Sequence, residues 1–298
     1  MDILIRIRRG AQWLVLAPVT VAALVACGGG GGGGNSSTST LNGVAVDGYI
    51  QGATVFLDRN GNGTLDSGEP NTITDASGRY SLSTEGISQP LTGLKVIVSG
   101  GIDTDTGYAF AGRLSARVED AQSGQVVTPL TTLIDAMVEQ KLAPDAATAR
   151  TQIATVLGLS ASDLTLDPMR VLDSKPGIYT TQVALQRAIQ LLASANAIAT
   201  ESPEQAQERV IQALAATVKA QSSRVSPGAL LAKLPASMQQ TDAAARLADS
   251  LHDALETALH DTDRNRGRDR SRAVLQSMDQ LRVQAENSGD YDLAKHAS

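Results

Sequence analysis

Short runs of β-forming residues, separated by clusters of Gly, Asn and Asp, occupy residues 44–127. The clearest runs are residues 53–57, 79–82, 95–98 and 114–118. Short strands at regular spacing, with turn residues between them, predict an antiparallel β-sandwich rather than β-α-β units. Residues 75–78 (Asp-Ala-Ser-Gly) lie between two such runs and predict a hairpin turn. We expect Phe56 and Phe110, the only phenylalanines, in the core of this part.

The hydrophobic period changes to 3.6 residues after Thr128. Thr128 offers a capping hydroxyl and Pro129 occupies the first helical position, which together predict a helix start. One apolar face then follows at Leu130, Leu133, Ile134, Met137, Val138 and Leu142. A helix is therefore expected directly after the last strand.

The same signals recur through the rest of the chain. Gly158 is expected to end a second helix, and the Ser-Pro pairs at 202–203 and 226–227 to begin two more, with Gln205 completing a capping box. The pattern predicts roughly six helices between residues 129 and 286. The predicted fold class is α+β multidomain, with an N-terminal β-sandwich followed by an all-α helical domain.

Composition excludes several classes of protein. The length of 298 residues suggests about two domains. A single cysteine excludes a disulfide scaffold, a cysteine-ligated zinc module and an iron–sulfur site. Aromatic residues make up only 3%, and 25 basic residues stand against 31 acidic ones, so we expect no nucleic-acid partner.

Residues 1–26 have the pattern of a secretory signal. Three arginines precede an apolar run at residues 11–23, which is shorter than the roughly 20 residues of a membrane-spanning helix. The segment ends in Leu-Val-Ala-Cys at residues 24–27, which resembles the lipobox of bacterial lipoproteins. An ordinary signal peptide with a nearby free cysteine is the alternative.

The lipobox resemblance implies that Cys27 becomes the lipidated first residue of the mature protein, as in palmitate-carrying lipoproteins. Because Gly28 stands where an aspartate would signal inner-membrane retention, the resemblance also implies the outer membrane, at its periplasmic face or the cell surface. Residues 27–42 continue in Gly and Ser, a composition typical of a flexible tether.

One motif carries metal chemistry. Residues 58–69 (Asp-Arg-Asn-Gly-Asn-Gly-Thr-Leu-Asp-Ser-Gly-Glu) match the twelve-residue calcium loop D-x-[DN]-x-[DN]-G-x5-E. Ca²⁺ takes oxygen ligands from carboxylates, amides and backbone carbonyls. The ligands expected from their loop positions are Asp58, Asn60, Asn62, the Thr64 carbonyl, Asp66 through water and Glu69 with both oxygens. Leu65 is expected to pin the loop to the fold. A turn-rich surface loop is the alternative.

The flanks of this loop are strands rather than helices. Residues 46–57, the loop and residues 74–82 together resemble the SdrD B-like (Cna-B-type) repeats and the carboxypeptidase regulatory-like, transthyretin-type domains of bacterial surface proteins. In the former, such a loop binds Ca²⁺ and stiffens a β-sandwich. The resemblance covers about 40 residues, contains one convincing loop where those repeats have several, and does not reach the helical part.

Three further groups of charged residues and histidines have ordinary structural interpretations. Asp103 and Asp105 suggest either a second weak calcium site or a hairpin tip. His252, Glu256 and His260 share a helical face, but the two histidines stand about 12 Å apart along it, which favours a solvated face over a zinc site. The alternating arginines at 264, 266, 268, 270 and 272 indicate a polar hinge, or a contact with anionic lipid.

The expected organisation is a signal peptide (1–26), a lipidated tether (27–42), a calcium-binding β-sandwich (43–127), a helical domain (128–263) and an arginine-rich hinge with a C-terminal helix (264–298). No nucleophile, zinc-protease or P-loop motif is present, so we expect no enzyme. The expected role is a cell-envelope lipoprotein with a structural, adhesive, or protein- or glycan-binding function. The alternatives are a secreted hydrolase with a carboxylate site in the helical domain, and a periplasmic accessory or inhibitor protein.

Overall fold

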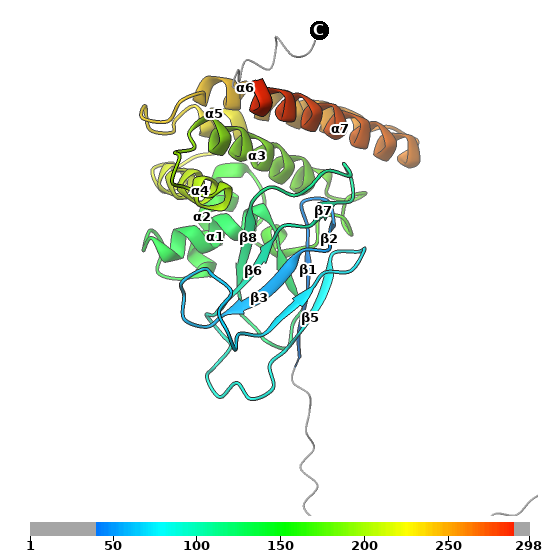
Figure 1. The fold of residues 1–298 in the computed structure, drawn as a ribbon. Helices are drawn as coiled ribbons and strands as arrows, with labels where there is room; N and C mark the ends of the chain where they lie inside the picture. Colours follow the sequence, from blue (N-terminus) through cyan, green and yellow to red (C-terminus); the bar gives the residue numbers. More distant parts are fainter. Residues whose placement is uncertain (1–39, 289–298) are drawn as a thin grey trace, which may run out of the picture. The chain divides into compact units, whose positions relative to one another are not determined.

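Strands fill the N-terminal half of the chain and helices the C-terminal half, as the hydrophobic pattern predicts (Figure 1). The structure is a computed structural model that describes residues 40–288. The strands are β1 (Thr40–Ala45), β2 (Ile50–Gln51), β3 (Thr54–Asp58), β4 (Asn71–Ile73), β5 (Arg79–Ser83), β6 (Lys95–Ser99), β7 (Ile102–Asp103), β8 (Arg113–Arg117) and β9 (Gln125–Val127). The described residues belong to one compact unit, so the change of pattern at residue 128 does not separate two bodies.

Two sheets share one apolar core. The four-stranded sheet has the order β4-β3-β6-β8 and is antiparallel throughout, whereas β5-β1-β9 pairs β1 with β9 in parallel. The predicted sandwich is therefore not purely antiparallel. Alternate residues of β3, such as Val55 and Leu57, enter the core beside Leu41 of β1 and Leu82 of β5. A separate short pair joins β2 to β7.

The other face of the four-stranded sheet packs against the helical part. Phe56, Ile97 and Ser115 lie side by side across β3, β6 and β8, and all three are buried. Ser115 hydrogen-bonds to residues of the first helix, so this face is covered rather than exposed to solvent. Both phenylalanines are buried as predicted, although Phe110 alone joins the core between the sheets.

Two local predictions need correction. Residues 75–78 do form a turn, but β4 before it pairs with β3 and β5 after it pairs with β1, so the turn joins two sheets and is not a hairpin. The tether expected to run to residue 42 ends earlier, because β1 begins at Thr40. In both cases the outcome depends on pairing with distant strands.

Seven α-helices follow in the described chain, one more than expected. They are α1 (Pro129–Glu139), α2 (Ala146–Leu157), α3 (Pro176–Ala195), α4 (Pro203–Lys219), α5 (Pro227–Leu231), α6 (Thr241–Leu259) and α7 (Arg264–Ser288), with a short 3₁₀ helix at Ala161–Thr165. The capping predictions are confirmed, since Thr128 caps α1, Ser202 and Gln205 form a capping box on α4, and Gly158 ends α2 in the left-handed conformation.

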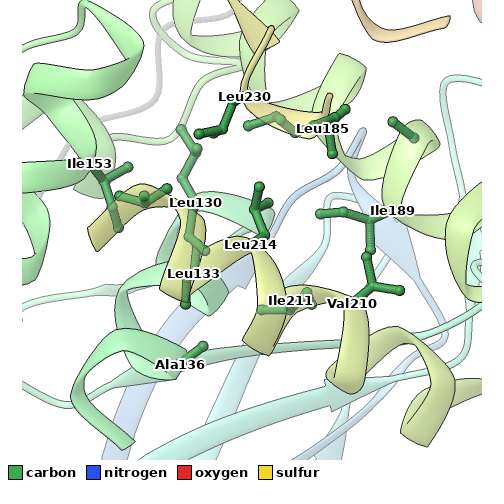
Figure 2. Close-up of a cluster of buried hydrophobic side chains, with 14 of the residues drawn as sticks. Leu130, Leu133, Ala136, Ile153, Leu185, Ile189, Val210, Ile211, Leu214 and Leu230 are labelled. Carbon is green, nitrogen blue, oxygen red and sulfur yellow. The ribbon is translucent and has the colours of Figure 1, made fainter. Parts of the chain in front are cut away.

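The apolar faces of these helices meet in a second core (Figure 2). Side chains from α1, α2, α3, α4 and α5 point toward one another there; those labelled include Leu130, Ile153, Leu185, Leu214 and Leu230. Burying a Leu or Ile side chain stabilises a fold by about 1.5–3 kcal/mol, so the helical part is held mainly by this cluster. In the part of the chain that the structure describes, no helix has the length and apolar character needed to cross a bilayer.

The segment expected to be a hinge is the first half of α7. Its arginines are paired with aspartates: Arg266 and Arg270 contact Asp261, and Arg264 and Arg268 contact Asp173. The buried face of α7 is narrow and contains both polar and apolar residues. They are Gly267, Ser271, Leu275, Asp279 and Arg282. The alternating arginines therefore belong to a continuous helix, and each of these two aspartates is shared by two of them.

Candidate metal centre

The twelve-residue loop at 58–69 connects β3 to β4, which are paired with each other. β3 ends at Asp58 and β4 begins at Asn71, and the base of the loop is closed by a hydrogen bond from the Leu57 amide to the Pro70 carbonyl at 3.0 Å. Asp58 and Glu69, the first and last loop positions, are 2% and 7% exposed. The two end carboxylates are thus anchored in the body while the middle of the loop faces solvent.

Asp58 organises the first half of the loop. Its Oδ1 accepts a hydrogen bond from the Gly61 amide at 2.7 Å, and its Oδ2 accepts one from the Gly63 amide at 3.0 Å. Gly61 and Gly63 both have positive φ, at 78° and 73°, which glycine adopts without strain. The chain consequently bends around the Asp58 carboxylate.

Three of the predicted ligand side chains converge at one point. The Asn60 and Asn62 amide nitrogens each donate to Oδ2 of Asp66 at 2.7 Å. Oδ1 of Asn60 accepts from the Asn62 amide, and Oδ1 of Asn62 accepts from the Thr64 amide and hydroxyl. A half-turn of each carboxamide exchanges its nitrogen and oxygen, which would present two amide oxygens beside the Asp66 carboxylate.

Glu69 closes the loop from its far end. Its Oε1 accepts from the Arg59 amide at 2.7 Å, and its Oε2 accepts from the Asp66 amide at 3.2 Å. The last loop position is therefore joined to the second and ninth positions. Asn60, Asn62, Asp66 and Glu69 lie in one connected network, to which Thr64 adds its amide and hydroxyl, whereas Asp58 bonds to the Gly61 and Gly63 amides of the same loop.

The candidate ligands offer the oxygen atoms that a hard cation requires, but in this structure those oxygen atoms are not oriented around a common point. All the candidate ligands offer oxygen, as Ca²⁺ requires. Within residues 40–288, however, no three carboxylate, histidine or cysteine side chains are grouped so that they could hold a metal ion. The carboxylates of Asp58 and Glu69 face amides of the loop backbone instead, so an ion would have to compete with these hydrogen bonds.

Two side chains tie the loop to the rest of the molecule. Arg113 of β8 donates to the Gly63 carbonyl at 2.5 Å and pairs with Glu208 of α4 at 2.5 Å. Lys95 of β6 lies 3.9 Å from Asp58 and 3.0 Å from Glu139 of α1. The conformation of the loop is thereby linked to two helices.

The structure contradicts one further prediction about the loop and does not reach the predicted lipidation site. Leu65 was expected to pin the loop to the fold, but the residue is 41% exposed and belongs to none of the apolar cores of the described chain, so that prediction is wrong. Arg113 and the two buried end carboxylates hold the loop instead. Cys27, the predicted lipidation site, lies outside the described residues.

Ile102 pairs antiparallel with Ala109, and the Asp103 amide donates to the Tyr108 carbonyl at 3.0 Å, so the predicted hairpin turn is confirmed. Asp103 and Asp105 lie in this turn. They are 3% and 6% exposed, and their side chains contact helices: Asp103 pairs with Arg187 at 2.8 Å and Asp105 accepts from the Tyr179 hydroxyl at 2.6 Å. Gly48 lies so close to Asp103 that an added Cβ would meet its Oδ1 at 2.3 Å. These contacts explain the burial and leave no calcium site at this pair.

Asp103 belongs to a buried ionic group that the sequence analysis missed. Arg187 of α3 contacts Asp47 at 2.5 Å, Asp103 at 2.8 Å and Asp279 of α7 at 3.1 Å, with Arg282 3.5 Å from Asp279. We call these five residues the arginine cluster. It joins the β part, α3 and α7, and every member is 7% exposed or less.

Carboxylates outnumber cations in the arginine cluster by three to two. Burial raises the pKa of Asp47 to about 7, against the opposing effect of Arg187, and burial likewise raises the pKa of Asp103. Burial alone would lower the pKa of Arg187, but the surrounding carboxylates raise it well above its ordinary value. The guanidinium therefore stays charged, and Asp47 is the group that can hold a proton.

One sequence signal could have indicated this cluster. Arg187 is the only charged residue in the twenty residues of α3, and its neighbours along the helix are apolar or glutamine. A lone charge within an otherwise uncharged helix predicts a buried partner. The partners at 47, 103 and 279 could not be identified, because nothing local connects them to residue 187.

The histidine face of α6 remains partly exposed. His260 lies 3.2 Å from Glu256 and its side chain is 71% exposed, whereas His252 is directed to Asp253 at 3.6 Å. Oε1 of Glu256 accepts from the Thr180 hydroxyl at 2.6 Å, so this carboxylate serves the α3–α6 contact.

Comparison with protein-family models, with curated proteins and with solved structures found no match to this chain.

Proposed function

We propose that this chain is an outer-membrane lipoprotein, anchored through Cys27, whose β module is a calcium-stabilised sandwich of the SdrD B-like or transthyretin type. Its role is structural, adhesive, or the binding of a protein or glycan in the cell envelope. The signal-like segment, the sole cysteine at the end of a lipobox and the glycine-rich stretch after it support the anchor.

The observation that carries the calcium proposal is the hydrogen bonding of the side chains within the loop of residues 58–69. Asp58 and Glu69 are fixed at the loop ends, and Asn60, Asn62 and Asp66 already meet through their side chains. Ca²⁺ would exchange the internal hydrogen bonds of the loop for ion–oxygen contacts. Asp58, Asn60, Asn62, Asp66 and Glu69 would hold it with the Thr64 carbonyl.

The expected affinity is low. The loop has three carboxylates and two amides, while Lys95 adds a positive charge 3.9 Å from Asp58. Fewer net ligand charges weaken calcium binding, which places the dissociation constant in the range of extracellular modules, about 10⁻⁴–10⁻³ M. An ion held at this affinity stabilises a fold and does not act as an intracellular signal.

Thermal unfolding of the full chain with Cys27→Ser, which blocks lipidation, tests the calcium site. At 10 mM calcium, an ion with that dissociation constant adds about 1.4–2.7 kcal/mol to the free energy of unfolding. The melting temperature should then rise by about 3–10 °C. Magnesium should raise it less, because it demands a tighter octahedral shell.

Variants separate a specific site from a general salt effect. Asp58→Ala and Glu69→Ala should each abolish the calcium-dependent rise. Glu85→Ala, which removes an exposed carboxylate of the same part, should keep it. A rise that persists in Asp58→Ala, or one that magnesium reproduces fully, would reject the loop as a calcium site.

The membrane and envelope parts of the proposal need cell experiments. The wild-type chain should fractionate with the outer membrane, and Cys27→Ser should release it. Protease treatment of intact cells then shows whether the body faces the medium or the periplasm. Turnover of polysaccharide or peptide by the purified chain, lost when a carboxylate of the helical part is replaced, would favour the hydrolase alternative instead.

A further inference from the structure

A pocket of about 150 Å³ lies where α3 and α4 meet α7 and the segment before β8. Its walls are mostly small and apolar, including Ala193, Ala197, Pro203 and Ala206. Two buried glutamines, Gln190 of α3 and Gln207 of α4, also line it. Apolar pockets with a few fixed polar groups are the usual form of a small-molecule site, and an apolar cavity of about 150 Å³ holds a ligand the size of benzene.

The orientation of both glutamine amides is fixed by the backbone. Gln190 donates its Nε2 to the Ala111 carbonyl at 3.1 Å, and Gln207 accepts from the Arg113 amide through its Oε1 at 2.8 Å. A carbonyl can only accept and an amide N–H can only donate, so neither carboxamide can turn over without losing its partner. The outer atom of each amide is thereby determined as well.

Those outer atoms have no partner. Oε1 of Gln190 and Nε2 of Gln207 are buried and make no hydrogen bond, in residues that are 6% and 2% exposed. Buried polar atoms are almost always paired in folded proteins, so an unpaired acceptor and an unpaired donor on the same pocket need an explanation. One acceptor and one N–H donor together are the complement of an amide group.

We propose that this pocket binds a small molecule that carries a carboxamide on a compact, branched apolar group. The ligand's N–H donates to Oε1 of Gln190, its carbonyl accepts from Nε2 of Gln207, and its apolar part packs on the alanines. Because both protein atoms are buried, the side chains around them must move apart slightly, which small alanine side chains permit. We call this site the amide pocket; it is independent of the calcium loop.

The chemistry of the pocket disfavours a charged ligand. A carboxylate would place a second acceptor against Oε1 of Gln190, and an ammonium group would face the Nε2 donor of Gln207. Both charged residues of the lining already face an opposite charge: Glu201 pairs with Arg209 at 2.7 Å, and Arg282 lies 3.5 Å from Asp279. The neutral amide is therefore the favoured class.

The amide pocket also touches the arginine cluster. Arg282 lines the pocket and lies 3.5 Å from Asp279, which contacts Arg187 at 3.1 Å. A ligand that packs on Arg282 should hold α7 in place. Binding should consequently slow hydrogen exchange of the α7 backbone near Asp279.

Three probes of matched shape test the ligand class: isovaleramide, isovalerate and methyl isobutyl ketone. They are titrated into the full chain carrying Cys27→Ser and followed by ligand-observed NMR and by the side-chain amide signals of Gln207. Isovaleramide should bind with a dissociation constant of about 1–10 mM, as suits so small a ligand, and shift those signals. The ketone and the carboxylate should bind at least tenfold more weakly, since each lacks the amide donor.

Variants decide whether binding occurs in this pocket. Ala197→Leu, at a partly open wall, should fill the space and weaken isovaleramide binding at least tenfold, whereas Ala216→Leu, on an exposed face of α4 outside the pocket, should not. Gln207→Met should abolish the preference for the amide over the ketone. Three results would each overturn the proposal. They are equal binding of the three probes, no isovaleramide binding at about 50 mM, and isovaleramide binding that Ala197→Leu leaves unchanged.

Discussion

At the scale of single residues, the backbone requirement is sharpest at Gly78. It has a φ of 68°, and an added Cβ would lie 2.4 Å from the Ala45 carbonyl, a backbone atom of β1 that cannot rotate away. Gly78→Ala should therefore lower the free energy of unfolding by about 2–4 kcal/mol through strain and a steric clash. Gly86 has a φ of 77° but open space around it, so Gly86→Ala should cost only about 1 kcal/mol. Equal losses in urea unfolding would show that the contact with Ala45 is unimportant.

The pH response of one buried carboxyl is a second prediction at this scale. Because burial raises the pKa of Asp47 from 3.8 to about 7, this group favours folding most below pH 4, and its contribution is lost as the pH rises through 7. Asp47→Asn keeps the neutral form at every pH. Between pH 5 and 8 the wild type should lose about 2–3 kcal/mol of stability relative to Asp47→Asn. Groups facing Asp47 are Arg187, Asp103 and Asp279, and all three remain in the variant. A difference between the two proteins that does not change with pH would contradict a raised pKa.

At the scale of elements, α3 is both an apolar helix and the carrier of a buried charge. Replacing Arg187 with Met keeps much of the side-chain volume but leaves three buried carboxylates without their main cation. Breaking such a group by removing one side typically costs about 3–5 kcal/mol. Arg187→Met should therefore be strongly destabilising at pH 8 and less so at pH 5, where the carboxylates can take up protons. Arg270→Met removes an exposed partner of Asp261 and should cost less than about 1 kcal/mol. Similar losses in these two variants would show that the arginine cluster contributes little.

The elements themselves show how far local sequence reaches. The starts of α1 and α4 and the end of α2 were predictable, because a capping hydroxyl, a following proline and a terminal glycine act within one turn. The separation of β4 and β5 into different sheets was not, since strand pairing is decided by distant partners. The start of α7 was missed because its arginines and aspartates show no apolar period; the helix is held by ion pairs and by a narrow buried face. The loop at 58–69 was recognisable as a motif, whereas the arginine cluster needed contacts between positions far apart in the chain.

At the scale of the whole described chain, buried polar contacts join the core between the sheets to the helical part, whose apolar side chains form a large and a smaller cluster. Ser115 of β8 donates to Asp135 of α1 at 2.8 Å, and Arg117 pairs with the same carboxylate at 2.7 Å. The arginine cluster makes a second junction among the β part, α3 and α7. If the two parts separated, these charged groups would lose their partners or become exposed. A buried charge without a partner lowers the free energy of unfolding. The sheets and the helices should therefore unfold together.

This cooperativity gives a last prediction, which also decides how calcium acts. Calorimetry of the full chain with Cys27→Ser should show one transition, with equal calorimetric and van't Hoff enthalpies. If the loop binds calcium, the entire transition should move upward, because the sheets that carry the loop unfold together with the helices. Arg113 connects the Gly63 carbonyl of the loop to Glu208 of α4. Arg113→Met removes that connection but no calcium ligand, so it should lower the transition temperature while leaving the calcium-dependent rise in place. Two separate transitions, of which calcium moves only one, would instead mean that the β part and the helices fold independently and that the buried junctions between them are weak.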